Sequence, residues 1–422
     1  MIMDFDLIIR QAYVRKQDNI LDIGIVKDRI TRISEHIEEK AKEEINANGK
    51  FLSPGFVNSH VHMDKSMTSI GERFPKYNND SRDEDNALRD VNRRKRIEAG
   101  LKYYSTASIE EVKSNTIQHA YSSIENGTSF IRTFVDIDKV ARLKALEGVL
   151  AARNELQELI DIQVVAFAQS GFLADPESEP LVRKAIEMGA DLVGSLNPVN
   201  PVTCEGNIEK ALDLVFKIAK DYNVDIDNHN MDIGTLGIYT LEAQAKKAIE
   251  NDYIGRVTAS HFYALGDAPI AWIDRAIPKF KEAGMKFVTC YLSTPYEMPV
   301  KKLLLAGITI AIATDNVRDF WRAYGNTDLV QAVLIEIHKL KMTTNPDLDL
   351  LWDMITTEGA KVLGIEEDYG IEEGKKADLV LLDALSPQWA IVDQAKKLYV
   401  IKNGKVIVRN EEILPEFKKY EV

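Results

Sequence analysis

Apolar, strand-like segments recur through the middle of this chain and alternate with helix-like segments. The intervening segments, such as Ile208–Tyr222 and Leu241–Asn251, carry apolar residues at helical spacing. Strands that alternate with helices and are apolar on both faces are typical of a parallel sheet covered by helices. Eight such strands predict a (β/α)8 TIM barrel. They are residues 56–62, 128–136, 161–169, 191–198, 224–230, 256–262, 286–292 and 308–315.

A doubly wound α/β sheet is the competing interpretation of the same alternation. Such sheets usually carry a glycine-rich phosphate-binding turn after the first strand. Here the first strand ends in a His-Val-His sequence at His60 and His62, which favours the barrel.

Both ends of the chain consist of short β-branched stretches separated by polar turns. Examples are Asp6–Arg10 and Arg29–Ser34 near the start, and Ala377–Asp383 and Lys405–Arg409 near the end. We therefore expect residues 1–55 and 371–422 to form one small β-sandwich domain around a barrel domain of residues 56–370.

The charge balance and the cysteine count exclude several classes of protein. The 422 residues include 53 Lys and Arg against 66 Asp and Glu, a net charge of −13, which disfavours nucleic-acid partners. Two cysteines, Cys204 and Cys290, cannot build a disulfide scaffold or a four-cysteine zinc site, and we interpret both as small apolar residues. The first residues lack a signal-peptide pattern, and no apolar run is long enough to cross a bilayer. We expect a cytoplasmic protein without a membrane partner.

Residues 63–105 form a long charged excursion after the first predicted strand. Mixed charge of this kind is typical of a solvated helix face. The excursion also starts where active-site loops leave such barrels, so a segment lying over the mouth of the pocket is the alternative.

Histidine and aspartate side chains end four of the predicted strands. His60 and His62 are two residues apart on the first strand, so both point to the same side. His229, His261 and Asp315 end the fifth, sixth and eighth strands. A single strand-end histidine is more often structural than a ligand, but five groups that converge on the catalytic end of a barrel favour a metal site. The remaining histidines lie in turn or helix contexts and are read as bystanders: His36, His119 and His338.

Seven segments at strand ends or at the turn into the C-terminal β segment carry further motif residues. They are residues 60–64, 132–136, 165–171, 227–237, 259–261, 314–321 and 370–380. Through nearly the whole chain these segments resemble the amidohydrolase superfamily, most closely its cytosine deaminase-like branch. Phe134 is a departure, because the family often has histidine at that point of the second strand.

The resemblance implies a single divalent metal ion, Zn²⁺ or Fe²⁺, bound by four side chains: His60, His62, His229 and Asp315. Such an ion lowers the pKa of a bound water molecule. His261 would orient that water, and Asp315 could accept its proton. A two-metal site would need a bridging group such as a carboxylated lysine, and residues 161–169 and 191–200 contain no lysine.

Asp232 stands where the deaminases carry a proton-shuttling glutamate, three residues after His229. Aspartate keeps the carboxylate, but its side chain is one methylene shorter than that of glutamate. Misplacing a catalytic group by about 1 Å can lower the rate on the order of 100-fold. The alternative is an aspartate that caps the next helix.

Three further residues are candidates for substrate binding. Gln169 matches the family residue that reads the amide face of a ring, and its alternative is a hydrogen bond at the barrel rim. Trp321 could form an apolar wall for a flat ring, or it could be core. Lys65 could pair with Asp64 or meet a polar substrate group.

The resemblance implies a hydrolytic deaminase of a small cyclic amidine or nucleobase-like heterocycle. Metal-bound hydroxide would attack the amino-bearing ring carbon, and ammonia would leave. Asp232 and Phe134 depart from the deaminase pattern and so leave an alternative open. The enzyme could instead be an amidohydrolase that removes an N-alkyl amine from a triazine, or it could be a creatinine-type iminohydrolase. A catalytically impaired, metal-stabilised binding protein is a further alternative. Zinc deaminases with an H-x-E and a P-C-x-x-C motif are excluded, because the chain has no such cysteine pair.

Members of the family commonly form homo-oligomers. The resemblance therefore leads us to expect a homo-oligomer.

Overall fold

The eight predicted strands form one parallel sheet in the computed structural model, which describes residues 5–17, 19–68, 86–196, 205–291 and 297–418. Each strand lies within its predicted segment, and neighbours in the sheet follow the order of the chain. The strands are β6 (Phe56–Val61), β7 (Thr128–Asp136), β8 (Asp161–Ala168), β9 (Leu192–Ser195), β10 (Asp225–His229), β11 (Val257–Ser260), β12 (Lys286–Cys290) and β13 (Ile310–Ala313).

A seam between the first and last strands nearly closes this sheet into a barrel. Val61 forms a parallel bridge with Asp315, and the Asp315 amide donates to the His60 carbonyl over 3.0 Å. Below it, the Asn58 amide side chain donates to Thr314 Oγ1 over 2.8 Å and accepts from the Thr314 amide over 3.2 Å. The prediction of a TIM barrel is confirmed, and the seam brings two predicted metal ligands together.

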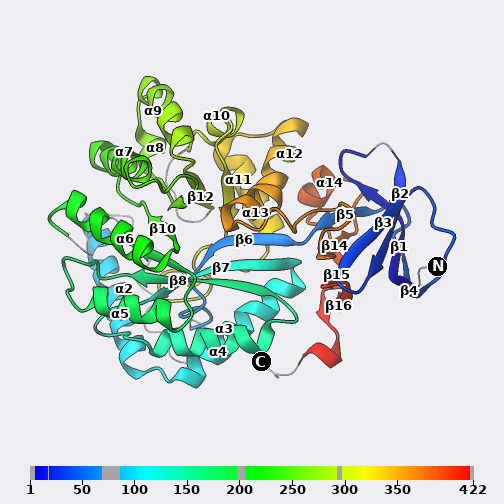
Figure 1. The fold of residues 1–422 in the computed structure, drawn as a ribbon, viewed down its shortest axis with the longest axis horizontal. Coiled ribbons are helices and arrows are strands. Elements are labelled where there is room, and N and C mark those ends of the chain that lie inside the picture. The colour runs from blue at the N-terminus through cyan, green and yellow to red at the C-terminus, as the bar shows by residue number, and fades with distance from the viewer. Residues whose placement is uncertain (1–4, 18, 69–85, 197–204, 292–296, 419–422) are drawn as a thin grey trace.

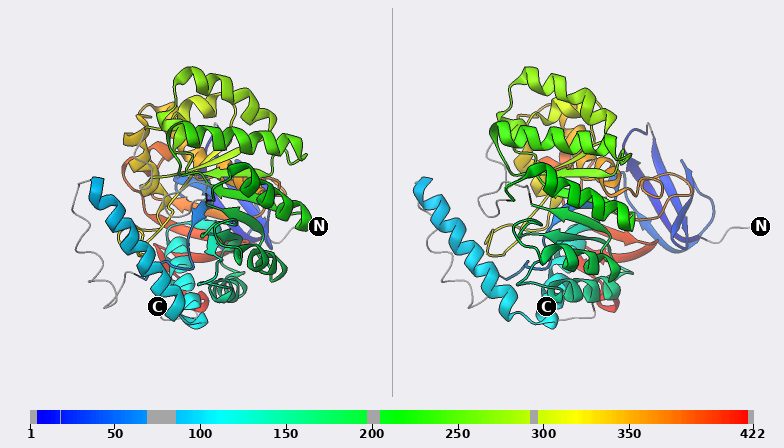
Figure 2. Two further views of the ribbon diagram at one scale, coloured as in Figure 1. Left: turned by 90° about the vertical axis from the view of Figure 1, so that its left-hand side faces the viewer. Right: turned by 60° about the vertical axis from the view of Figure 1, so that its left-hand side comes forward.

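Helices surround the barrel sheet on its outer side (Figure 1, Figure 2). They bury one apolar face each, as α6 does with Val215, Phe216 and Ala219, because apolar residues at helical spacing share a face. The helices are α2 (Asn86–Thr106), α3 (Ile109–Glu125), α4 (Lys144–Leu156), α5 (Ser178–Glu187), α6 (Ile208–Tyr222), α7 (Gly234–Glu250), α8 (Ala264–Asp267), α9 (Ile270–Glu282), α10 (Val300–Leu305), α11 (Leu329–Leu340), α12 (Asn345–Met354), α13 (Thr357–Leu363) and α14 (Pro387–Val392).

The two chain ends build a second, mixed sheet beside the barrel, at the right of Figure 1. β14 from the C-terminal segment pairs antiparallel with β5 from the N-terminal segment, so the sheet contains strands of both ends, as predicted. Its strands are β1 (Phe5–Val14), β2 (Ile20–Val26), β3 (Arg29–Ser34), β4 (Ala41–Asn46), β5 (Phe51–Pro54), β14 (Leu379–Leu382), β15 (Lys397–Lys402), β16 (Lys405–Arg409) and β17 (Glu412–Ile413). The domain boundaries at residues 55 and 370 stay a prediction.

The charged excursion is helical at its end, where α2 packs against the turn after β6. The hydroxyl of Tyr104 donates to Asp64 Oδ2 over 2.5 Å, and that of Tyr103 donates to the Asp64 carbonyl over 3.0 Å. This part of the excursion therefore contacts the candidate site, while residues 69–85 lie outside the described residues.

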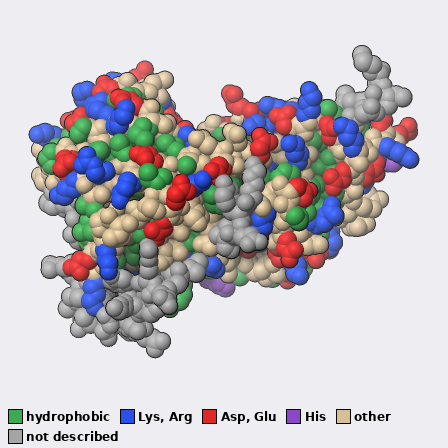
Figure 3. Space-filling view, turned by 90° about the horizontal axis from the view of Figure 1, so that it is seen from below, with side chains coloured by type: hydrophobic (Ala, Val, Ile, Leu, Met, Phe, Trp, Pro, Cys, Tyr) green, Lys and Arg blue, Asp and Glu red, His purple; other side chains and the backbone are tan. Residues whose placement is uncertain are grey.

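Lys and Arg side chains are interspersed with Asp and Glu on the face shown in Figure 3. Within the described ranges, none of the helices combines the length and the apolar composition that a bilayer crossing requires.

Candidate metal and substrate site

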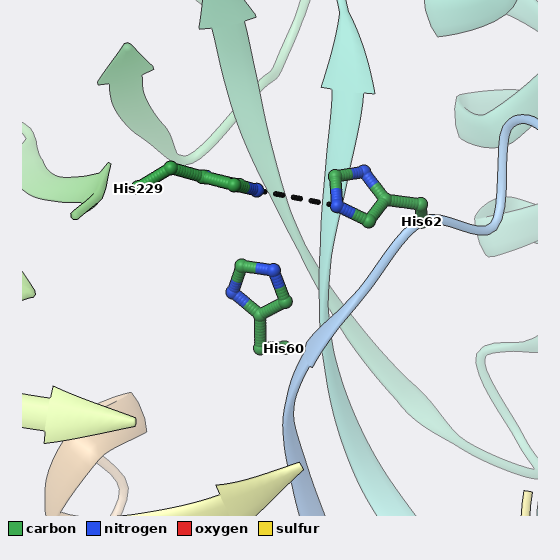
Figure 4. A group of neighbouring side chains, drawn as sticks. All are labelled: His60, His62 and His229. Carbon is green, nitrogen blue, oxygen red and sulfur yellow. Dashed lines mark hydrogen bonds between the residues drawn. The ribbon is translucent and has the colours of Figure 1, made fainter. Parts of the chain in front are cut away.

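Three imidazole rings meet at the carboxyl-terminal end of the barrel sheet (Figure 4). His60 lies near the end of β6, His62 follows that strand, and His229 ends β10. The Nε2 atoms of His62 and His229 are 3.3 Å apart. Asp315 Oδ1 lies 3.6 Å from His60 Nε2 and 3.5 Å from His62 Nε2. The four side chains predicted as metal ligands thus surround one small space.

His261, directly after β11, completes this group. Its ring centroid lies 4.8 Å from that of His60 and 4.9 Å from that of His229. His261 and Asp315 both have positive φ, at 73° and 61°. Left-handed backbone at non-glycine residues is uncommon and gathers at functional sites, where it directs a side chain that a regular strand would aim elsewhere.

Burial keeps the histidines of this site neutral. Loss of solvation lowers the pKa of His60, His62 and His229 well below 6.5. It also lowers the pKa of His261, although the nearby Asp315 charge opposes the shift. A neutral imidazole has a lone pair on one ring nitrogen, which is the form that binds metal ions.

The donor atoms fit a divalent metal ion. His60 Nε2 is fully buried and has no hydrogen-bond partner among the described residues, which is costly unless another group satisfies it. One ligand atom from each of His60, His62 and His229 lies within 4.8 Å of the others. Three imidazoles and one carboxylate are a sensible ligand set for Zn²⁺ or Fe²⁺.

A chain of hydrogen bonds fixes the ring of His60 from behind. Its Nδ1 lies 2.9 Å from Ser260 Oγ, and Ser260 Oγ donates to Asp227 Oδ1 over 2.7 Å. Because the single hydroxyl proton of Ser260 points to that carboxylate, Nδ1 of His60 must be the donor in its own bond. The lone pair of His60 then lies on Nε2, which faces the other proposed ligands. Arg132 Nη1 holds the far oxygen of Asp227 over 2.9 Å.

Replacing Ser260 with alanine is expected to weaken metal binding about 10- to 100-fold, the usual effect of removing the partner of a ligand histidine. Competition of the purified protein against a chromophoric chelator measures this affinity. Ser123→Ala, which removes a buried serine from α3, is the matched control and should leave the affinity unchanged. Equal affinities of the two variants would contradict the role of Ser260.

Two phenylalanines pack against the histidines. The ring centroid of Phe134 lies 4.2 Å from that of His60, and Phe167 stacks on His229 at 4.2 Å. Phe134, at the position where the family often has histidine, therefore serves as a packing surface for the rings.

A cavity opens over the histidines and Asp315. All three residues predicted to bind substrate line it, namely Lys65, Gln169 and Trp321. The other lining residues are His62, Leu196, His229, Met231, His261, Asp315 and Asn316. Leu196 and Met231 belong to the apolar cluster that also contains Phe134 and Phe167. The cavity thus has an apolar wall next to the imidazoles and polar groups around it.

Lys65 supplies a fixed positive charge to this cavity. Its Nζ, almost fully buried, donates to Asp136 Oδ1 over 2.7 Å. Burial works against the charge, but the carboxylates of Asp136 and Asp64 outweigh it and raise the pKa of Lys65. The partner of Lys65 is thus Asp136, while Asp64 accepts from Tyr104 and from the Asp136 amide.

Two buried carboxylates hold the loops that carry Trp321 and Gln169. Asp319 accepts from the amides of Trp321 and Arg322 over 2.8 Å and from Asn316 Nδ2 over 2.7 Å. Burial raises the pKa of Asp319 to about 7. Glu205 accepts three successive amides after Gln169, from residues 172 to 174, over 2.6 to 2.7 Å.

Asp232 is buried three residues after His229, between β10 and α7. Met231, its neighbour, lines the cavity, whereas Asp232 is not among the lining residues. The N-cap position of α7 is Ile233, which directly follows Asp232 and whose side chain forms no cap hydrogen bond.

Five residues around the site have contacts that the sequence motifs do not predict: Ser260, Asp227, Arg132, Leu196 and Met231. Strand alternation could have found Asp227, because it lies two residues before His229 on β10 and shares its face. Ser260 carried no such signal, since its contact with His60 joins side chains of two strands that are not neighbours in the sheet.

Comparisons with known proteins agree with this geometry. The Amidohydrolase family model matches residues 43–408. N-isopropylammelide isopropyl amidohydrolase of Pseudomonas sp. (strain ADP) is 57% identical over 414 residues, which cover 98% of this chain and 100% of that protein. The solved structure of N-isopropylammelide isopropylaminohydrolase from Burkholderia multivorans ATCC 17616 is similar with a TM-score of 0.87 and 30% identity, over 98% of this chain and 100% of that one. The solved structure of 5-methylcytosine deaminase from Klebsiella pneumoniae is similar with a TM-score of 0.85 and 27% identity. The similarity covers 95% of this chain and 97% of that one. The chain belongs to the amidohydrolase family and is a hydrolase that acts on carbon–nitrogen bonds.

Proposed function

We propose that this enzyme removes an N-alkyl amine from a triazine ring by hydrolysis, at a single divalent metal ion. The cavity carries this proposal, because the apolar side chains of Leu196 and Met231 lie beside His229. An amino group on the ring would gain nothing from such a wall, whereas a branched alkyl group would bury its methyl groups there, at about 0.8 kcal/mol for each buried carbon unit. The 57% identical relative, whose name contains an N-isopropyl triazine, supports the same substrate class.

The proposed metal ligands are His60, His62, His229 and Asp315. A bound Zn²⁺ or Fe²⁺ supplies Lewis acidity and a water molecule of lowered pKa. His60, on β6, and His62, directly after it, would hold one side of the ion, and His229 would hold the other from β10. The aromatic packing of Phe134 and Phe167 keeps the rings in place and excludes bulk water from behind.

Three carboxylate or imidazole groups are proposed to move protons. Asp315 accepts the proton of the attacking water, and His261 orients that water and donates to the oxygen of the tetrahedral centre. Asp232 carries a proton to the departing amine nitrogen. The leaving group must be protonated before the carbon–nitrogen bond breaks, because an amide anion is too basic to leave.

The ring itself is proposed to lie between Gln169, Lys65 and Trp321. The carboxamide of Gln169 can pair with an adjacent N–H and C=O of a ring that carries oxo groups. Lys65 favours a ring with partial negative charge at its oxygen atoms. Trp321 offers a flat face. Together they favour an oxygenated triazine.

A deaminase acting on an amino-substituted ring is the second candidate. The similarity in structure to 5-methylcytosine deaminase over 95% of this chain favours it. The two reactions share the attack on the ring carbon and differ in the amine that leaves.

An assay of the released amine tests this proposal. The protein is reconstituted with Zn²⁺ or with Fe²⁺ and incubated with N-isopropylammelide, with its unalkylated amino analogue and with cytosine. We expect isopropylamine from the first compound, at a kcat/KM about tenfold or more above the others. Faster ammonia release from either amino compound would favour the deaminase instead.

Replacing Asp232 with asparagine is expected to leave the metal bound and lower kcat about 100-fold or more, since general acid–base groups contribute about 10²- to 10⁴-fold. Steady-state kinetics and elemental analysis of the same preparation measure both quantities. Glu242→Gln, a charge-neutralising change on α7, is the control. If Asp232→Asn turned over at the wild-type rate, the proton-transfer role would be wrong.

A further inference from the structure

Cys290 lies closer to the site than its interpretation as a small apolar residue suggests. It ends β12, the seventh strand of the barrel, and its side chain is buried and forms no disulfide. It packs in an apolar cluster with Val288 and Ala313. The strand order places β12 between β11, which precedes His261, and β13, which precedes Asp315.

The thiol belongs to a second group of potential metal ligands. One ligand atom from each of His60, His261 and Cys290 lies within 4.8 Å of the others. His261 Nδ1 and His60 Nε2 are buried atoms without a hydrogen-bond partner among the described residues. His60 is shared with the group formed by His62 and His229.

The two groups differ in chemical softness. Three imidazoles and a carboxylate are borderline donors, whereas two imidazoles and a thiolate are softer and favour Cd²⁺ or Zn²⁺. A divalent ion bound by one thiolate keeps one positive charge, and the Asp315 carboxylate, 3.6 Å from His60 Nε2, can neutralise it. Nδ1 of His60 lies 2.9 Å from Ser260 Oγ, which leaves Nε2 as the ring nitrogen that can bind a metal ion.

We propose that His60, His261 and Cys290 form an inhibitory site for a soft divalent cation, Cd²⁺ or excess Zn²⁺. On binding, the Cys290 S–H bond breaks, a metal–sulfur bond forms and the proton passes to solvent, with no change of oxidation state. The bound ion takes His60 from the hydrolytic ligand set and His261 from the orientation of water. Inhibition follows because neither residue is then available for hydrolysis.

Titration of the Zn²⁺-loaded full-length enzyme with CdCl₂, and separately with excess ZnCl₂, tests this site. Wild type, Cys290→Ser, Cys290→Ala and Cys204→Ser are compared. In wild type we expect inhibition together with the ultraviolet charge-transfer band of a cadmium–thiolate bond. Loss of this direct ligand in both Cys290 variants should remove the band and raise the inhibitory concentration about tenfold or more. Cys204→Ser, the matched control, should behave as wild type.

Two substitutions at position 290 separate loss of the thiol from a folding defect. Alanine keeps the position apolar, while serine keeps a polar atom there. Thermal melting identifies a variant that does not fold. The proposal is overturned if the folded Cys290→Ala protein keeps the wild-type band and inhibition, or if Cys204→Ser loses them. It is also overturned if wild type binds Cd²⁺ without a thiolate band. The band does not depend on turnover, so these results are independent of which amine the enzyme releases.

Discussion

Replacing His229 with alanine is expected to reduce the bound metal to a small fraction of the wild-type content and to abolish turnover. His229 Nε2 lies 3.3 Å from His62 Nε2, so its removal takes away one side of the proposed ligand set. Removing a residue that only hydrogen-bonds to a ligand lowers the affinity for the metal about 10- to 100-fold, and removing a ligand itself lowers it further. Elemental analysis after gel filtration measures the metal content, and the amine assay measures turnover.

His36→Ala is the matched control, because the side chain of His36 is 75% exposed and lies in the terminal sheet region. It should keep the metal content and activity of wild type. Full metal retention in folded His229→Ala would overturn the ligand assignment. Retention of metal with loss of turnover would instead make His229 a residue that contacts the reacting groups.

Replacing Arg132 with leucine is expected to lower the free energy of unfolding by about 3–5 kcal/mol, the usual result of leaving one charge of a buried pair without its partner. The side chains of Arg132 and Asp227 are 2% and 0% exposed, and their closest atoms are 2.9 Å apart. Arg132 also donates to Gln163 and to the Val362 carbonyl, so the change leaves several buried acceptors unsatisfied. Urea denaturation of the metal-free proteins measures the loss.

The control for this change is Arg142→Leu. Arg142 pairs with Glu177 at 3.3 Å, but both side chains are about 60% exposed. Pairs of this kind contribute about 0–1 kcal/mol, so the variant should unfold like wild type. Equal unfolding free energies for Arg132→Leu and Arg142→Leu would show that the buried pair is not needed for stability.

Arg132→Leu should also change how the free energy of unfolding depends on pH. Burial raises the pKa of Asp227 to about 6 from its ordinary value of 3.8, although Arg132 opposes the shift. The folded protein therefore holds this proton more tightly than the unfolded chain, and the contribution of Asp227 to stability falls as pH rises from about 4 to 6. Without Arg132 the pKa rises further, so the decline should continue above pH 6.

Local pattern allowed the barrel and the convergence of the strand-end His and Asp side chains to be predicted, whereas the choice of the four ligands came from the resemblance to the amidohydrolase superfamily. Apolar runs mark the strands, and His60, His62, His229 and Asp315 each lie at a strand end. In a parallel barrel all such ends meet at one rim, so no knowledge of side-chain contacts was needed.

The surrounding shell could not be predicted in the same way. The contact of His60 with Ser260 joins residues 200 positions apart, and the proximity of Cys290 to His60 and His261 depends on how strands pack across the barrel. The sequence offers Asp64, next to Lys65, as one partner, but the ion pair of Lys65 is with Asp136 on β7. These contacts depend on register and rotamers, which the periodicity of one strand does not specify.

The seam between β6 and β13 also sets an order of events during synthesis on the ribosome. His60 and Asp315, which meet there, are 255 residues apart in the chain. At about 5–20 residues per second, the ribosome needs roughly 10 to 50 s to make the segment between them. β5 likewise cannot complete its pairing in the terminal sheet until β14 has been made. The nascent chain therefore exposes an unpaired strand edge through most of translation, and the proposed ligand set is complete only after Asp315 has been made.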